Sequence, residues 1–302
     1  PIPSWSPAAS RRITSVPFYL IHQAGKVASQ TLSWTITMAD RSARVERHHY
    51  LEASNLDEVD RLCDVAKLSS QVQSLRKQTN EARAAMLALA NQEPTNVWVL
   101  TGFRDPLDLA ISAFFQNLSY YSRDYVSPEP GESYDQQRFD AQVDRVIESF
   151  RSHFDEHLNR VRTGTDVANV RELDLRRKLQ DIGVWFEREF KTVHGIDVYG
   201  LDIGSRSFIH FEERGVNFVL YRMETFAARA GDVIAELPIP KGSPVVSDNV
   251  SAAKDYAILY QRFRERFAPT DEMVEYYYES PFYRHFYRES QPLYRIGASA
   301  AS

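Results

Sequence analysis

The sequence contains a single cysteine, Cys63, among 302 residues. One cysteine excludes an intrachain disulfide framework and a zinc site built from several thiolates, so we expect a reducing compartment. No apolar run approaches the roughly 18 residues of a membrane-spanning helix, and residues 1–15 lack the apolar core of a signal peptide. We therefore expect no membrane span and a cytoplasmic location. The chain does not begin with methionine, which leaves a removed leader open.

An excess of positive charge is also missing. The 36 basic and 41 acidic side chains give a formal net charge of −5. Broad nucleic-acid binding requires a basic surface that displaces counterions, so the balance argues against that function. An anionic ligand would have to be bound by a local cluster of cations.

Two glycine-rich nucleotide motifs are absent. No GxGxxG stretch occurs, which removes the main sequence support for a nicotinamide enzyme. The GxxxxGK[ST] loop of nucleoside triphosphatases fails as well, because Leu20 stands at its first glycine and Val27 at its hydroxyl position. That hydroxyl would bind magnesium, so a usual triphosphatase loop is excluded.

Strand-like and helix-like segments alternate along the chain. Such alternation predicts an α/β fold with a mainly parallel sheet covered by helices. No repeat or clean linker is present, so we expect an N-terminal extension, one domain with helical insertions and a flexible tail, over 1–15, 16–295 and 296–302. The expected strands are 16–21, 43–49, 97–102 and 216–221. The expected helices are about 56–91, 138–162, 171–193, from Glu224, 251–267 and 270–279, and the one long loop is 119–137.

The stretch HQAGKVASQT (22–31) follows the first expected strand and opens a helix with hydroxyl side chains. A strand, a small-residue turn and a helix N-terminus present several backbone N–H groups to a phosphate. Lys26 would add a movable positive charge. An ordinary strand-to-helix turn is the alternative. The candidate phosphate-binding residues are Gly25, Lys26, Val27, Ala28, Ser29, Gln30 and Thr31.

A second anion signal follows the third expected strand, in FRDPLDLAISAFF (103–115). Arg104 stands at the strand's exit, Asp105-Pro106 is a helix-start signature, and Ser112 lies two helical turns further on. A guanidinium can bind a phosphate bidentately, and the helix can bring the serine hydroxyl to the same group. The alternative is an arginine paired with Asp105 or Asp108.

The two stretches resemble the phosphate-binding motifs of sulfotransferases. IHQAGKVASQTL is similar to their 5′-phosphosulfate loop, and FRDPLDLAISAFF to their 3′-phosphate motif. Three later blocks resemble the bacterial capsular polysaccharide branch in the same order, so the likeness runs from about residue 16 to 290. These blocks are WFEREFKTVHGIDVYG (185–200), FVLYRMETF (218–226) and SPFYRHFYRES (280–290).

The resemblance implies a P-loop-like three-layer fold and transfer of a sulfuryl group from 3′-phosphoadenosine 5′-phosphosulfate (PAPS) to a hydroxyl, expected on a saccharide or polysaccharide. Lys26 would stabilise the bridging oxygen, the loop would hold the 5′-phosphate, and Arg104 with Ser112 would hold the 3′-phosphate.

For the base, the place to examine is the second strand, RVERHHYLEA. Its two histidines alternate faces, so only one can point inward from a regular strand. The family's His-x-His strand matches His49 at its second position, but Arg47 stands at the first. His49 is therefore the expected base, with His48 as the alternative.

Other polar groups have structural alternatives. His153 and His157 have the spacing of metal ligands on a helix, but no third ligand is evident and the transfer needs no metal. Arg222 and Glu224 match a family Arg-x-Glu, or form an internal ion pair, and Lys241-Gly242 resembles distantly a loop near the 3′-phosphate. The aromatic residues of 276–287 fit core packing better than sugar stacking. Three tyrosines of the long loop are the better candidates for acceptor contacts, namely Tyr120, Tyr121 and Tyr125.

Two other functions compete with a sulfotransferase. A kinase-like phosphotransferase with a degenerate phosphate loop is disfavoured by Val27 after Lys26. A non-catalytic nucleotide-binding module is supported only by the departure at Arg47. The sequence leaves open the acceptor, O- against N-sulfation, and the oligomeric state.

Overall fold

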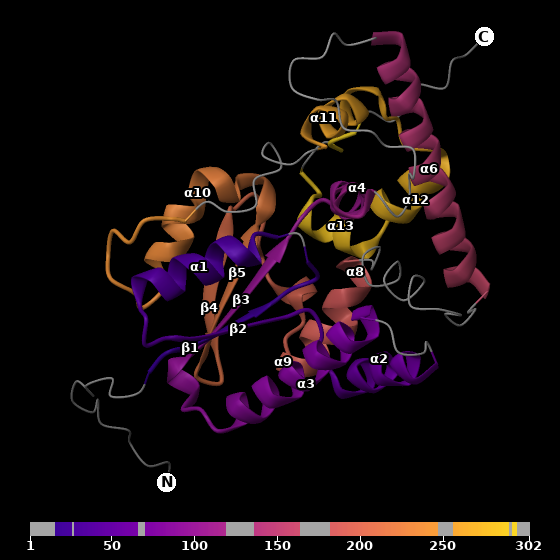
Figure 1. Ribbon diagram of the computed structural model, residues 1–302. Coiled ribbons are helices and arrows are strands. Elements are labelled where there is room, and N and C mark those ends of the chain that lie inside the picture. Colours follow the sequence, from indigo (N-terminus) through magenta and orange to yellow (C-terminus); the bar gives the residue numbers. More distant parts are fainter. Residues whose placement is uncertain are drawn as a thin grey trace.

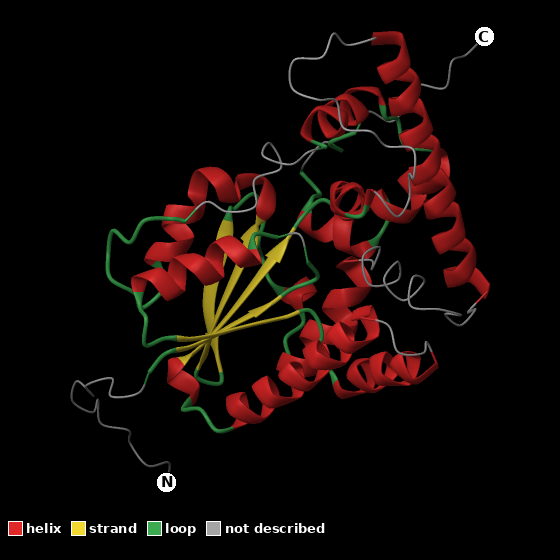
Figure 2. Cartoon of the chain, in the orientation of Figure 1, coloured by secondary structure: helices red, strands yellow, loops and turns green. Residues whose placement is uncertain are grey.

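A computed structural model describes residues 16–25, 27–65, 70–118, 136–163, 182–246, 256–289 and 292–294. These residues form an α/β structure around a five-stranded sheet in the order β2-β1-β3-β5-β4 (Figures 1 and 2). Four strands run parallel, and β4 is antiparallel to β5. The strands are β1 (Phe18–His22), β2 (Arg44–His48), β3 (Val97–Phe103), β4 (Phe208–Glu213) and β5 (Val216–Arg222).

The four expected strands are confirmed, and the mainly parallel sheet with them. The fifth strand, β4, joins the edge through a tight turn whose residues Arg214 and Gly215 have φ of 52° and 82°. Positive φ at both central residues is the geometry of a two-residue hairpin, which explains the antiparallel direction of β4.

Helices cover both faces of the sheet (Figure 1). On one face lie α1 (Ser29–Ala39) and α10 (Met223–Ala235), whose apolar side chains pack with Tyr19 and Ile21. The alternate residues of β1, Phe18 and Leu20, belong to the core on the other face. Because successive strand side chains point to opposite faces, both sides of β1 must be apolar, and its five residues are all buried.

The expected long helix over 56–91 is wrong in one respect, because two helices occupy it: α2 (Ala53–Val65) and α3 (Ser70–Ala90). Arg83 of α3 bonds Asp57 at 2.8 Å and Asp60 at 2.6 Å in α2. In one straight helix, residues 57 and 83 would be about 39 Å apart at 1.5 Å per residue. Pairing the two helices lets each cover the other's apolar side.

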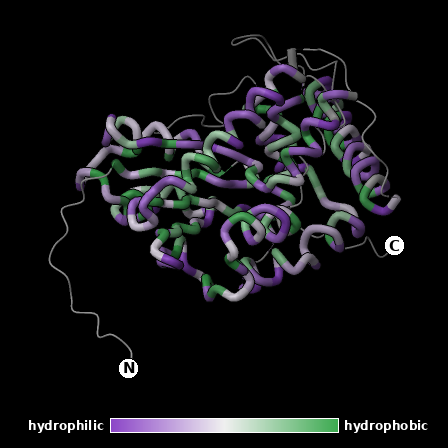
Figure 3. The backbone as a smooth tube through the Cα atoms, turned by 90° about the horizontal axis from the view of Figure 1, so that it is seen from below, coloured by the Kyte–Doolittle hydropathy of each residue, from purple (hydrophilic) through white to green (hydrophobic). Residues whose placement is uncertain are grey.

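A group of helices lies beyond the carboxyl ends of the parallel strands, toward the upper right of Figure 1. Their aromatic side chains interlock, as in the contacts of Phe150 with Phe263 and Phe267. Figure 3 shows hydrophilic and hydrophobic stretches alternating along the helices, as expected for elements with one buried side. The group comprises α4 (Pro106–Gln116), α6 (Gln136–Thr163), α11 (Ala257–Arg266), α12 (Asp271–Tyr278) and α13 (Pro281–Phe286).

Of the expected helix 171–193, the described part begins at residue 182. It comprises α8 (Ile182–Trp185), a π-helical segment η2 (Phe186–Lys191) and α9 (Thr192–His194). Short 3₁₀ turns, η1 (Pro94–Asn96) and η3 (Val198–Gly200), precede β3 and follow α9. None of the helices formed by the described residues combines the length and apolar character of a membrane span.

Candidate functional site

The strand order places the two expected anion segments side by side. From β1 the chain crosses to β2 on one side, and it later returns to β3 on the other side of β1. The strands β1 and β3 are parallel neighbours, with Ile21 opposite Leu100. In open α/β sheets, ligands bind outside the carboxyl ends of the strands where the strand order reverses. The loop after β1 and the segment after β3 both leave the sheet at this position.

The loop after β1 packs onto the end of β3 through Val27. The Val27 side chain is 1% exposed, and a Cβ built on Gly102 would lie 2.7 Å from its Cβ. The Tyr221 hydroxyl, from β5, donates a hydrogen bond to the Val27 carbonyl oxygen. Absence of a side chain at 102 therefore lets the loop lie across the ends of two strands. Lys26 itself lies outside the described residues.

The expected helix start after the loop is confirmed. Ala28 adopts the left-handed conformation with φ of 59°, and the Leu32 N–H donates to its carbonyl oxygen at 3.1 Å. Gly25 also has a positive φ, 105°. Two left-handed residues turn the chain sharply from β1 into α1. The side chains of the first turn are half-buried: Ser29, Gln30 and Thr31.

His49 stands at the exit of β2, beside this loop. Its Nδ1 is 2.9 Å from the carbonyl oxygen of Gln23, and its Cε1 would lie 3.6 Å from a Cβ on Gly25. A carbonyl oxygen only accepts hydrogen bonds, so Nδ1 carries the proton and Nε2 carries the lone pair. The imidazole is exposed. It therefore has the tautomer that a general base acting through Nε2 requires.

His48 has a different environment. Its side chain is 8% exposed, and its Nε2 lies 3.4 Å from a Glu46 carboxylate oxygen. Burial lowers the pKa of His48, although Glu46 opposes that shift. Of the two histidines considered, His49 has the more accessible ring and lies against the expected phosphate loop.

Arg104 leaves the end of β3 and pairs with Asp108. Its Nε and Nη2 donate to Asp108 Oδ2 at 2.7 and 2.6 Å. The Tyr294 hydroxyl donates to the other carboxylate oxygen at 2.8 Å. The pairing named as an alternative for Arg104 is thus present, and a phosphate would share the guanidinium with Asp108. Ser112 lies one helical turn beyond Asp108, on the same side of α4.

Asp105 starts α4 as the sequence predicts. Its carboxylate accepts from the Asp108 N–H at 2.9 Å, with Pro106 in the first turn. Its own N–H donates to Glu224 at 2.6 Å, and Glu224 accepts from the Tyr287 hydroxyl at 3.0 Å. Burial raises the pKa of Asp105 to about 7.

Arg222 and Glu224, expected either to match the family pattern or to pair with each other, bind different partners. Arg222 donates to the carbonyl oxygens of Gly204 at 3.1 Å and Phe286 at 2.6 Å, with its guanidinium 4.7 Å from the Tyr287 ring centre. These contacts fasten the end of β5 to one segment that precedes it in the chain and to one that follows it.

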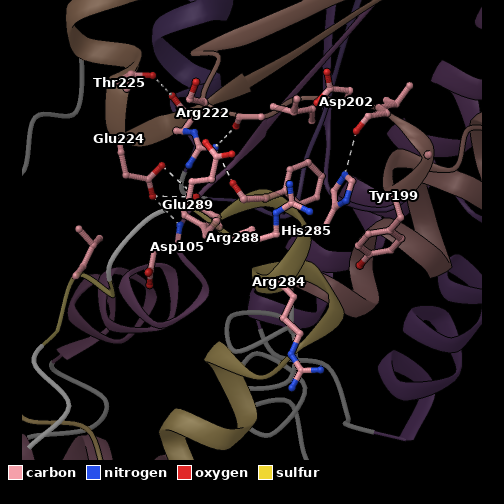
Figure 4. A pocket seen from close by; sticks show the side chains of 18 residues that line it. Asp105, Tyr199, Asp202, Arg222, Glu224, Thr225, Arg284, His285, Arg288 and Glu289 are labelled. Carbon is pink, nitrogen blue, oxygen red and sulfur yellow. Dashed lines mark hydrogen bonds between the residues drawn. The ribbon is translucent and has the colours of Figure 1, made fainter.

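A pocket of ≈ 660 Å³ opens at this end of β5. Figure 4 shows Arg222 and Glu224 at one side of it and Arg284 pointing away from the other labelled side chains. Most of its other lining residues come from segments 199–205 and 284–289, which sequence reasoning did not assign to a site. The only available signal was that both overlap or adjoin blocks of the family resemblance.

A buried polar cluster lies beneath the loop, and the sequence analysis did not anticipate it. His22, the last residue of β1, is fully buried, with Nδ1 3.0 Å from His194 Nε2 and Nε2 3.5 Å from Glu189. Burial lowers the pKa of His22 to about 3 and that of His194 well below its usual value. Both rings are therefore neutral. Burial raises the pKa of Glu189 to about 7.

The histidines with metal-ligand spacing have other contacts. His157 Nε2 is 3.0 Å from the Tyr276 hydroxyl, and His153 lies 3.9 Å from Glu156. Within the described part of the chain, no group of three His, Cys, Asp or Glu side chains is arranged to hold a metal ion.

Three further expectations concern aromatic and basic residues. The aromatic side chains near the C-terminus, such as Tyr277 and Phe282, are buried, which confirms core packing. The tyrosines 120, 121 and 125 lie outside the described residues. Lys241 and Gly242 form an exposed turn, with Gly242 at φ of 79°.

Comparison with protein-family models, curated proteins and solved structures finds no match to this chain.

Proposed function

We propose that this chain is a PAPS-dependent sulfotransferase of P-loop-like fold that acts in the cytoplasm on a saccharide hydroxyl. The observation that carries the proposal is the meeting of its two expected phosphate segments where the strand order reverses. The segments follow β1 and β3, which are hydrogen-bonded neighbours. A donor with two separated phosphates fits two anion sites at adjacent strand ends.

The proposed chemistry assigns one role to each end of the reacting bond. His49 Nε2 takes the proton of the acceptor hydroxyl, and the acceptor oxygen forms a bond to sulfur. The bond between sulfur and the bridging phosphate oxygen breaks, and that oxygen gains negative charge. Lys26 would stabilise this charge by its position in the sequence. The products are a sulfate ester and 3′,5′-adenosine bisphosphate, and no metal takes part.

The geometry around Arg104 supports a role in binding the 3′-phosphate. The Arg104 side chain is 16% exposed, and its guanidinium donates to Asp108 through Nε and Nη2 and also bonds the Tyr260 side chain. A 3′-phosphate would bind this charge at the start of α4, and Ser112 is the residue that the sequence pattern assigns to the same phosphate.

Calorimetric titration with 3′,5′-adenosine bisphosphate tests the donor site. We expect the wild type to bind it at least tenfold tighter than 5′-AMP, NADH or ATP with magnesium. Arg104→Ala should lose that preference, and Arg104→Lys should recover only part of it, because an ammonium cannot bind bidentately. Arg83→Ala is the matched control, since it removes a paired arginine from α3.

Three outcomes would contradict the proposal. Equal affinity for the bisphosphate and 5′-AMP would mean that no second phosphate site exists. Magnesium-dependent turnover of ATP would favour the kinase-like alternative. Bisphosphate binding without transfer from PAPS to dextran, chitosan or polygalacturonate would favour the non-catalytic binding module.

A further inference from the structure

Two side chains of the 182–194 segment bond the backbone that carries His49. The Trp185 Nε1–H donates to the His49 carbonyl oxygen at 2.8 Å. One turn later, Glu189 accepts from the Leu51 and Glu52 N–H groups at 3.0 and 3.1 Å. The Trp185 and Glu189 residues are 3% and 1% exposed. These buried hydrogen bonds hold the backbone before and after Tyr50, and they therefore fix the path of the chain as it leaves β2.

The same carboxylate also reaches the end of β1. Glu189 Oε2 lies 3.5 Å from His22 Nε2. If His194 Nε2–H donates to His22 Nδ1, the remaining His22 proton is on Nε2 and faces the carboxylate, which is the favourable arrangement. His22 directly precedes Gln23, whose carbonyl oxygen binds His49 Nδ1. Glu189 therefore contacts both chain segments that meet in the hydrogen bond between His49 and Gln23.

An exposed histidine on a bend would otherwise sample several rotamers and both neutral tautomers. The backbone bonds to Trp185 and Glu189 limit where the His49 ring can lie, and the Gln23 carbonyl then selects the Nδ1–H form. The π-helical segment adds to this argument, because single π-helical turns occur frequently at functional sites. It begins directly after Trp185 and contains Glu189.

We propose that Trp185 and Glu189 are positioning residues that hold His49 in its Nδ1–H form beside the loop after β1. The catalytic meaning of this arrangement rests on the proposed function, in which His49 is the base. The arrangement itself can be measured without turnover.

The test is nuclear magnetic resonance of protein labelled with ¹⁵N-histidine, recorded at pH 8, with His49 assigned from the spectrum of His49→Gln. We expect the wild-type His49 ring to be in the Nδ1–H form. Trp185→Phe keeps an aromatic ring but removes the N–H donor. The ratio of the two tautomers should shift about fivefold toward the Nε2–H form, as expected for loss of one hydrogen bond. Trp98→Phe is the matched control: it makes the same change at the start of β3, where the Trp98 ring contacts His210 and not His49. It should leave the His49 tautomer ratio unchanged.

Glu189→Gln provides a second variant. Its amide oxygen can still accept from one or both backbone N–H groups, but its NH₂ group cannot accept from Asn55, which donates to Glu189 at 2.6 Å. We expect a tautomer shift in the same direction, with bisphosphate affinity within twofold of the wild type.

The results separate this proposal from the proposed function. An unchanged His49 tautomer in folded Trp185→Phe and Glu189→Gln would overturn the positioning roles, as would a wild-type His49 in the Nε2–H form. A third result would support the positioning roles and contradict the donor site. In it, wild-type His49 is in the Nδ1–H form and the tautomer ratio shifts in both variants, but the protein does not bind the bisphosphate.

Discussion

Gly102 lies directly against Val27, so that a Cβ at position 102 would come within 2.7 Å of the Val27 Cβ and of the Tyr221 ring. Real Cβ atoms do not approach other atoms so closely. The glycine at the end of β3 therefore permits the loop after β1 to cross the edge of the sheet, and it connects the two expected phosphate segments physically.

Gly102→Ala should displace that loop. We expect a loss of about 1–3 kcal/mol in the free energy of unfolding, typical of overpacking, and weaker binding of 3′,5′-adenosine bisphosphate. Gly231→Ala is the control, because nothing lies within 4 Å of a Cβ there and alanine favours the helix α10 by about 0.5–1 kcal/mol. Chemical denaturation and calorimetry measure both effects. Wild-type stability and affinity in Gly102→Ala would contradict this packing.

Tyr221 should stabilise the same loop through its hydroxyl. Tyr221→Phe removes the donor to the Val27 carbonyl oxygen and should cost about 1 kcal/mol of unfolding free energy. Tyr19→Phe serves for comparison, since the buried Tyr19 hydroxyl has no hydrogen-bond partner among the described residues. Its removal should be neutral or stabilising. Equal losses in the two variants, measured by urea denaturation, would refute the role of the bond.

If the proposed reaction takes place, His49→Ala should reduce sulfuryl transfer from PAPS by about 100-fold or more, the usual effect of removing a general base. The affinity for 3′,5′-adenosine bisphosphate should change little, because the proposed base acts on the acceptor. His48→Ala is the paired variant and should retain most of the transfer rate, since its side chain lies beside Glu46. The opposite pattern in transfer assays would assign the base to His48.

The pH dependence of stability should contain opposing contributions. Burial raises the pKa of Asp105 and Glu189 to about 7, so near pH 5–6.5 the folded chain binds protons that the unfolded chain has released. These carboxyls make the unfolding free energy fall as pH rises. Burial lowers the pKa of His22 and His194, so below pH 6.5 the unfolded chain binds protons that the folded chain does not. Those rings make the unfolding free energy rise with pH, so the contributions of these four groups nearly cancel from about pH 5 to 6.5.

Asp105→Asn removes one of the two falling contributions and keeps a side chain that can cap α4. Relative to the wild type, its unfolding free energy should therefore rise from pH 5 to 6.5, by roughly 1.4 kcal/mol per pH unit at most. Denaturant titrations at several pH values measure this slope, with exposed Asp232→Asn as the control. A variant curve parallel to that of the wild type would show that Asp105 titrates normally.

Local sequence determined the strands and the two helix starts of the site. The apolar run 16–21, too short for a typical helix and followed by a glycine-containing turn, predicted a buried strand, and Asp105-Pro106 predicted a helix start without help from distant residues. Four strands and the start of α4 were therefore predictable. The break between α2 and α3 was not, because a helical pattern persists through both, and the pairing of Arg83 with Asp57 and Asp60 depends on tertiary contact.

By itself, the sequence determined an α/β chain with two segments that resemble phosphate-binding motifs and a pair of histidines at the end of its second strand. Only the tertiary structure decided that these segments follow adjacent strands, that Nδ1 of His49 meets the Gln23 carbonyl, and that Arg104 pairs with Asp108. It also brought Trp185 and Glu189 to the end of β2 across more than a hundred residues of chain. The reason is physical: periodicity and capping act within a few residues, whereas strand order and side-chain partners are fixed by burial of surfaces distant in sequence.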